Sequence, residues 1–167
     1  MTGNTAVPAP SASATSPQQS ADPIPRPLRR FLLALLYFGM FGVAVELFLL
    51  EHTEHWQQWI PFGVLAVGFV AITAAAVRPN RLTLLAFRAV MVAFVISGIL
   101  GIYLHYNGNV VFELEMVPAM KGRELIWNSL KGATPIGAPG FMTQLGLLGL
   151  AYTYRHPRLA RDTGERV

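Results

Sequence analysis

The chain has 167 residues, of which 53% are hydrophobic and only 13% are charged. Soluble domains carry about 25% charged residues, so this deficit indicates long segments that do not face water. The absence of cysteine excludes disulfides, thiolate metal sites and cysteine nucleophiles. The net charge of +4 does not indicate nucleic-acid binding, because the basic residues cluster beside apolar runs, where they set membrane orientation.

The first 28 residues are rich in Ser, Ala, Thr, Pro and Gln and show no hydrophobic periodicity. This composition predicts a disordered cytoplasmic tail. It does not fit a secretory signal peptide, since no basic start leads directly into a short apolar core.

Four apolar runs follow the tail and predict membrane-spanning helices. Residues 31–50 form a run of twenty with one ionisable group, which is long enough to cross a hydrocarbon core of about 30 Å. The last run is shorter and rich in glycine. We predict an all-α, up-down bundle of four spans within residues 29–156, followed by a basic tail at 157–167. The predicted spans cover residues 31–50, 58–77, 82–105 and 135–154.

The basic residues predict the orientation of these spans. Nine of them flank the runs on the side that carries both termini, and three lie on the opposite side. Arg88 lies inside the third run, from which its long side chain can reach the headgroups. Because cytoplasmic segments carry the excess of Lys and Arg, both termini are predicted to face the cytoplasm, as in a bacterial inner-membrane protein.

The long outer segment, residues 107–134, is predicted to be partly structured. Asn107, Gly108 and Asn109 indicate a turn. Residues 110–117 then alternate like a strand, which places Glu113 and Glu115 on one face. Paired carboxylates can bind a divalent cation or share a proton, although such a pair is more often the solvated side of a half-buried strand.

The rest of the outer segment predicts a short amphipathic helix over residues 119–131. Its apolar side chains are Met120, Ile126, Trp127 and Leu130. Such a helix is expected to lie on the outer membrane surface or to cap the open end of the bundle.

Two polar side chains lie inside the apolar runs. Glu46 is near the outer end of the first run, and an ionisable group at membrane depth costs on the order of 2.5 kcal/mol or more. It is therefore either a proton, metal or substrate site or a hydrogen-bonded link between helices. Gln144, near the middle of the fourth run, needs a hydrogen-bond partner, for which Glu46 or Ser97 would serve.

An outer-face metal site is the most specific hypothesis. His52, His55 and His105 gather at the outer end with Glu46, and imidazole and carboxylate ligands suit a divalent transition metal. The site requires the first helix to end near Glu51 and the first and third spans to approach each other. The simpler interpretation is that these polar residues mark helix ends at the membrane interface.

No phosphate-binding loop, dinucleotide fingerprint, nucleophile elbow or zinc-protease motif is present, and the sequence does not predict an enzyme. The leading prediction is a non-enzymatic accessory membrane protein that contacts the lipid bilayer and binds a membrane-protein partner or a second copy of itself. The alternatives are a metal-binding or redox membrane protein and a proton-coupled transporter that uses Glu46.

Overall fold

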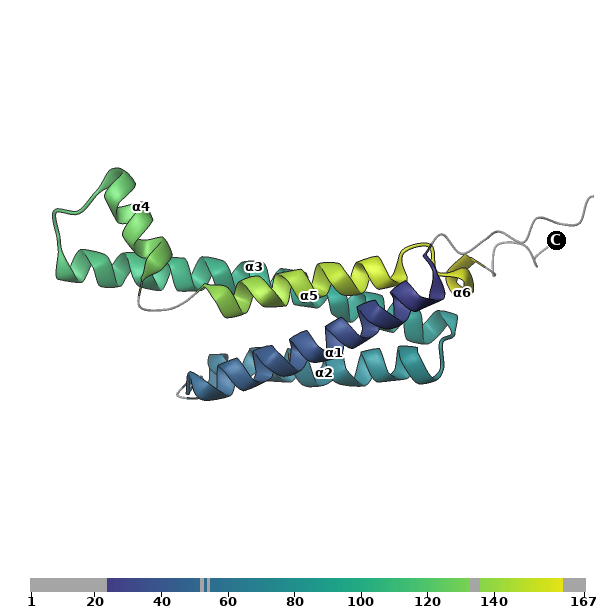
Figure 1. The fold of residues 1–167 in the computed structure, drawn as a ribbon. Helices are drawn as coiled ribbons and strands as arrows, with labels where there is room; N and C mark the ends of the chain where they lie inside the picture. Colours follow the sequence, from purple (N-terminus) through teal and green to yellow (C-terminus); the bar gives the residue numbers. More distant parts are fainter. Residues whose placement is uncertain (1–23, 52, 54, 133–135, 161–167) are drawn as a thin grey trace, which may run out of the picture.

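The computed structural model describes residues 24–51, 53, 55–132 and 136–160, and these residues are helical without a strand. The two longest helices are α3 (Arg81–Met116) and α1 (Arg26–Leu49). The other elements are the 3-10 helix η1 (Trp56–Gln58), α2 (Trp59–Val77), α4 (Gly122–Lys131), α5 (Gly137–Thr153) and α6 (Pro157–Ala160). Figure 1 shows the long helices side by side, with the start of α1 and α6 at the same end.

The long helices pack in a ring. Helix α1 packs against α2 and α5, and α3 packs against the same two helices, whereas the backbones of α1 and α3 do not come close to each other. The most extensive pairing is that of α3 with α5. The first and third helices therefore occupy opposite corners of the ring.

Three helices are long and apolar enough to cross a membrane: Arg26–Leu49, Trp56–Val77 and Arg81–Met116. Helix α5 has 17 residues and rises only about 26 Å at 1.5 Å per residue. That rise is shorter than the hydrocarbon core of about 30 Å, so the length of α5 does not by itself establish a fourth crossing.

The predicted strand in the outer segment is wrong. Helix α3 continues through the expected turn at Asn107 and ends only at Met116. A contact with α4 accounts for the difference, because Asn109 is 1% exposed and its Nδ2 donates a hydrogen bond to the carbonyl oxygen of Ser129 at 2.9 Å. This bond satisfies the buried amide from within a helix. The amphipathic helix expected over residues 119–131 is present as α4.

The predicted ends of the chain need one correction. The tail expected up to residue 28 stops earlier, because α1 already begins at Arg26. Residues 1–23 of that tail lie outside the described residues, as do residues 161–167 of the basic C-terminal tail.

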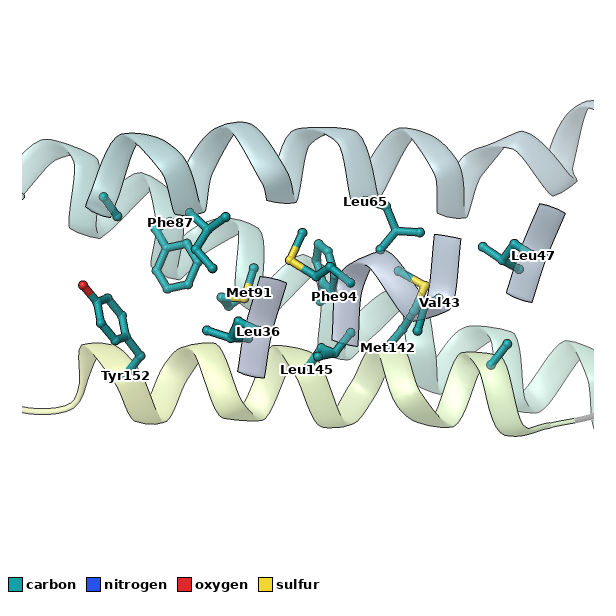
Figure 2. Packing of buried hydrophobic residues seen from close by; sticks show 14 of the residues in the cluster. Leu36, Val43, Leu47, Leu65, Phe87, Met91, Phe94, Met142, Leu145 and Tyr152 are labelled. Atoms are coloured by element: carbon teal, nitrogen blue, oxygen red, sulfur yellow. The ribbon is translucent and has the colours of Figure 1, made fainter. Parts of the chain in front are cut away.

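A continuous apolar core runs along the axis of the ring. Its fully buried side chains include Leu36 and Met40 of α1, Leu65 of α2 and Phe87 and Phe94 of α3. Figure 2 shows the side chains of Leu36, Leu65 and Phe94 in the same interior as those of Met142 and Leu145 of α5. The large apolar side chains on the outside of α1, α2 and α3 remain exposed, as expected for helices whose solvent is lipid.

Glycines allow α3 and α5 to approach at backbone distance. A Cβ atom added to Gly98 would lie 2.6 Å from both the carbonyl oxygen of Pro139 and the amide nitrogen of Thr143. A Cβ atom on Gly146 would lie 2.7 Å from the carbonyl oxygen of Met91. Since these neighbours are backbone atoms, a larger residue at either position would have to push the helices apart.

We predict that Gly98→Ala lowers the stability of the protein by about 1–3 kcal/mol, the usual cost of overpacking. Gly42→Ala is the matched control, because a Cβ atom there meets nothing within 4 Å. Thermal unfolding in a mild detergent should show a lower midpoint for the first variant only. Equal midpoints for the two variants would contradict the close α3–α5 contact.

Candidate functional site

A cavity of about 460 Å³ opens at the end of the ring where α1 joins α2. Leu47 and Leu50 line it from the end of α1, Leu104 from α3 and Met142 from the start of α5. The wall is mostly apolar, and its polar members are Gln57, Gln58, Ser97 and His105. Such a lining can bury the apolar part of an amphiphilic molecule and offer hydrogen bonds to its polar end.

Helix α1 ends beside this cavity, where the backbone leaves the helical conformation. Glu51 adopts a left-handed conformation with φ of 50°, and α1 stops at Leu49. The expected end of the first helix near Glu51 is therefore confirmed. The chain re-enters helix at His55, whose backbone N–H donates to Oε1 of Gln58 at 2.9 Å. This bond holds the side chain of Gln58, which lines the cavity, against the turn before η1.

The structure describes three of the four residues of the predicted metal site. His105 is half-buried and lines the cavity, His55 is exposed at the start of η1, and Glu46 is half-buried on α1 outside the cavity lining. His52 lies outside the described residues. In the described part of the chain, no group of three or more His, Asp or Glu residues is placed to hold a metal ion.

The helical form of the outer segment changes the geometry of the paired carboxylates. Residues two apart on a helix point about 200° apart, so Glu113 and Glu115 do not share a face as they would on a strand. Glu113 is half-buried and Glu115 is exposed. A two-carboxylate cation site formed by this pair alone is therefore not supported.

Gln144 is exposed on the outer surface of α5 and does not face the core. Among the hydrogen bonds of the described residues, none joins it to Glu46 or Ser97, so the expected interhelical link is not formed. An exposed amide near the middle of an apolar helix is left facing lipid unless another protein covers it.

The C-terminal part of α3 and the whole of α4 form a second feature of this end, which we call the outer arm (residues 106–132). Among the described helices, α4 contacts only α3, so of the two positions expected for it the cap over the open end of the ring is not formed. Figure 1 shows α4 folded back beside the projecting end of α3.

Helix α4 packs on α3 through its small and polar side. Ser129 is fully buried in this contact, with Leu125 and Asn128 half-buried beside it. The apolar side chains Ile126 and Leu130 are exposed, and Trp127 is 60% exposed. The hydrophobic face of this amphipathic helix is thus left uncovered within the described chain.

Three contributors to this end were missed by the sequence reasoning. Two of them are Gln57 and Gln58, which directly precede an apolar run. Their position could have indicated polar side chains at the end of the bundle. The structural role of Asn109 was hidden because Asn107-Gly108-Asn109 indicates a turn when it is considered without tertiary contacts.

Comparison with known proteins assigns the chain to no family, since no family model, curated protein or solved structure matches it.

The outer metal site stays a prediction that depends on His52. If the site exists, His52→Ala together with His105→Ala should abolish metal retention, because a four-ligand site would lose two imidazoles. Elemental analysis of protein purified in mild detergent measures this, with His156→Gln at the opposite end as the control. Unchanged metal content in the double variant, or no metal in the parent after metal-replete expression, would exclude the site.

The outer arm is predicted to resist limited proteolysis from the outer side. Asn109→Ala should accelerate cleavage within residues 117–132, because it removes the hydrogen bond to the Ser129 carbonyl and leaves that acceptor without the Asn109 amide. Ser129→Ala is the control, since its buried hydroxyl makes no hydrogen bond with any described residue. Rapid cleavage of the parent protein, or equal acceleration by both substitutions, would contradict this account of the arm.

Proposed function

We propose that this chain is a non-enzymatic, partner-binding subunit of the membrane, with four crossings and both termini in the cytoplasm. Its three apolar helices are compatible with a small integral membrane protein. The observation that carries the proposal is the outer arm, whose apolar side chains face away from the rest of the chain.

The length of α3 supports a position of much of the arm beyond the lipid. Its 36 residues rise about 54 Å, far more than a hydrocarbon core of about 30 Å. If the crossing ends near His105, residues 106–116 continue for about 16 Å, whereas the headgroup layer adds only about 5–7 Å on each side. Phe112, Met116 and Val117 are exposed at this level, where acyl chains do not reach.

The composition of the arm favours an apolar protein surface as its partner. Its charged side chains balance, with Glu113, Glu115 and Glu124 against Lys121, Arg123 and Lys131. Charge attraction therefore does not select the partner. The exposed aromatic and aliphatic side chains supply the kind of anchors that dominate protein–protein binding energy.

A second feature supports contact within the membrane. Gln144 faces outward from α5, and amide side chains in apolar surroundings associate through interhelical hydrogen bonds that contribute about 0.6–2 kcal/mol. A neighbouring transmembrane helix on this face would satisfy the amide. The arm and α5 would then contact the same partner from outside and from within the bilayer.

We predict that a photoreactive amino acid placed at Trp127 crosslinks to a discrete membrane protein in cells that express the chain natively. The same group at Trp56, a tryptophan of η1 that is 73% exposed and lies outside the outer arm, is the control and should give little of that product. Gel mobility and mass spectrometry of the crosslinked species measure the result.

The identity of the crosslinked product discriminates among the alternatives. A product of twice the chain's mass would show that a second copy covers the arm. Crosslinks to lipid alone, or equal yields from the two positions, would contradict partner binding by the apolar face of α4.

The proposed topology has its own test. Reporter fusions after residues 53, 80, 125 and 160 are expected to report outside, inside, outside and inside, as the nine-to-three distribution of basic residues predicts. An outside signal at residue 160 would mean that α5 does not cross the membrane.

A further inference from the structure

A strongly basic pocket of about 550 Å³ lies at the end of the ring that carries α6. Four arginines line it: Arg26, Arg29 and Arg30 from the first turns of α1, and Arg158 from α6. His156, in the turn after α5, completes the polar wall.

Tertiary packing brings these residues together from distant parts of the chain. Arg29 is 7% exposed, and its guanidinium donates hydrogen bonds to the carbonyl oxygens of Tyr152 and Tyr154, the latter at 3.3 Å. These bonds attach the start of α1 to the end of α5. His156 is 9% exposed, and its Nδ1 accepts a hydrogen bond from the backbone N–H of Arg158 at 3.3 Å. The pocket is therefore part of the folded core of this end.

The described part of the pocket contains no negative charge. Its lining consists of arginine, histidine and proline, and the first turn of α1 has no acidic residue. The residue before α1 is Pro25, which provides no side-chain hydrogen bond to the helix start. The N-terminal end of a helix carries partial positive charge, so it adds to the arginines and attracts an anion.

We propose that this pocket binds the phosphate group of an anionic phospholipid. Arginine side chains bind phosphate oxygens through paired N–H donors, a geometry that a strongly hydrated lysine does not match. Three of the arginines are exposed at the pocket, namely Arg26, Arg30 and Arg158, whereas Arg29 is buried. The assignment is independent of the partner proposed for the outer arm.

The position of the pocket selects a lipid as the source of the phosphate. Arg29 and Arg30 directly precede the apolar run that starts at residue 31, within about 3 Å of axial rise from it. That depth corresponds to the headgroup layer, which occupies about 5–7 Å beyond the hydrocarbon core. Basic pockets between helices at this level are suited to lipid headgroups.

The test uses the full chain purified in a neutral detergent, with phosphatidylglycerol as the probe and phosphatidylcholine as the zwitterionic reference. Native mass spectrometry counts bound lipid during titration. Arg30→Gln with Arg158→Gln removes two exposed charges from the pocket and leaves Arg29 in place. Arg78→Gln with Arg155→Gln removes two exposed charges from the same end outside the pocket.

We expect one phosphatidylglycerol to bind in preference to phosphatidylcholine. The pocket double variant should weaken its binding on the order of 25-fold, because each arginine near a membrane surface contributes about fivefold. The control double variant should retain the binding. If both double variants lost the same amount of phosphatidylglycerol binding, the binding would depend on the overall charge of this end and not on the pocket. That result would overturn the proposal.

Two further measurements distinguish the lipid from other anions. If inorganic phosphate at the same concentration displaced the bound phosphatidylglycerol, the pocket would be a site for soluble phosphate, and the lipid would be rejected. If Asp162→Asn with Glu165→Gln strengthened phosphatidylglycerol binding more than tenfold, the C-terminal carboxylates would be the occupants of the pocket. That result would also overturn the proposal.

Discussion

The backbone contact between α3 and α5 is the constraint on which the rest of the structure depends. In lipid no hydrophobic effect drives helices together, so close packing at Gly98 and Gly146 has to supply the association. The register set there fixes both ends of α5. At one end Pro139 lines the cavity where α1 joins α2, and at the other the carbonyl oxygen of Tyr152 accepts a hydrogen bond from the guanidinium of Arg29. A shift along the α3–α5 contact would disturb the cavity and the basic pocket together.

Sequence reasoning was most successful where one physical requirement dominated. Long apolar runs predicted four spans, and three of the corresponding helices are long and apolar enough to cross a membrane. The polar exit near Glu51 predicted the end of α1. The outer segment was harder, because eight residues of alternating character fit a strand or one side of a helix. What decided between them was the contact of Asn109 with α4, twenty residues further along the chain. Such a long-range bond has no signature in the local pattern.

The candidate site was less predictable than the fold for a reason specific to membrane helices. A lipid-facing surface and a buried surface are both apolar, so a single sequence does not show which face of a span is turned inward. Gln144 was therefore expected in the interior and is found on the outside. The metal hypothesis met the same difficulty, since it assumed that the first and third spans are neighbours. These spans occupy opposite corners of the ring, although residues of both, Leu47 and His105 among them, line one largely apolar cavity. The site itself stays a prediction, because His52 lies outside the described residues.

The two ends of the ring present different surfaces, and this asymmetry follows from how charge is distributed along the chain. The outer arm is electrically balanced and apolar, a surface suited to protein contact, whereas the opposite end concentrates arginine. Counting basic residues predicts an orientation but treats each arginine alone. Arg29 and Tyr152 are 123 residues apart, and their hydrogen bond unites the start of α1 with the end of α5. Because α5 returns beside α1, basic side chains from both ends of the chain surround one pocket. The same arginines that predict the orientation of the spans therefore also form the proposed binding surface.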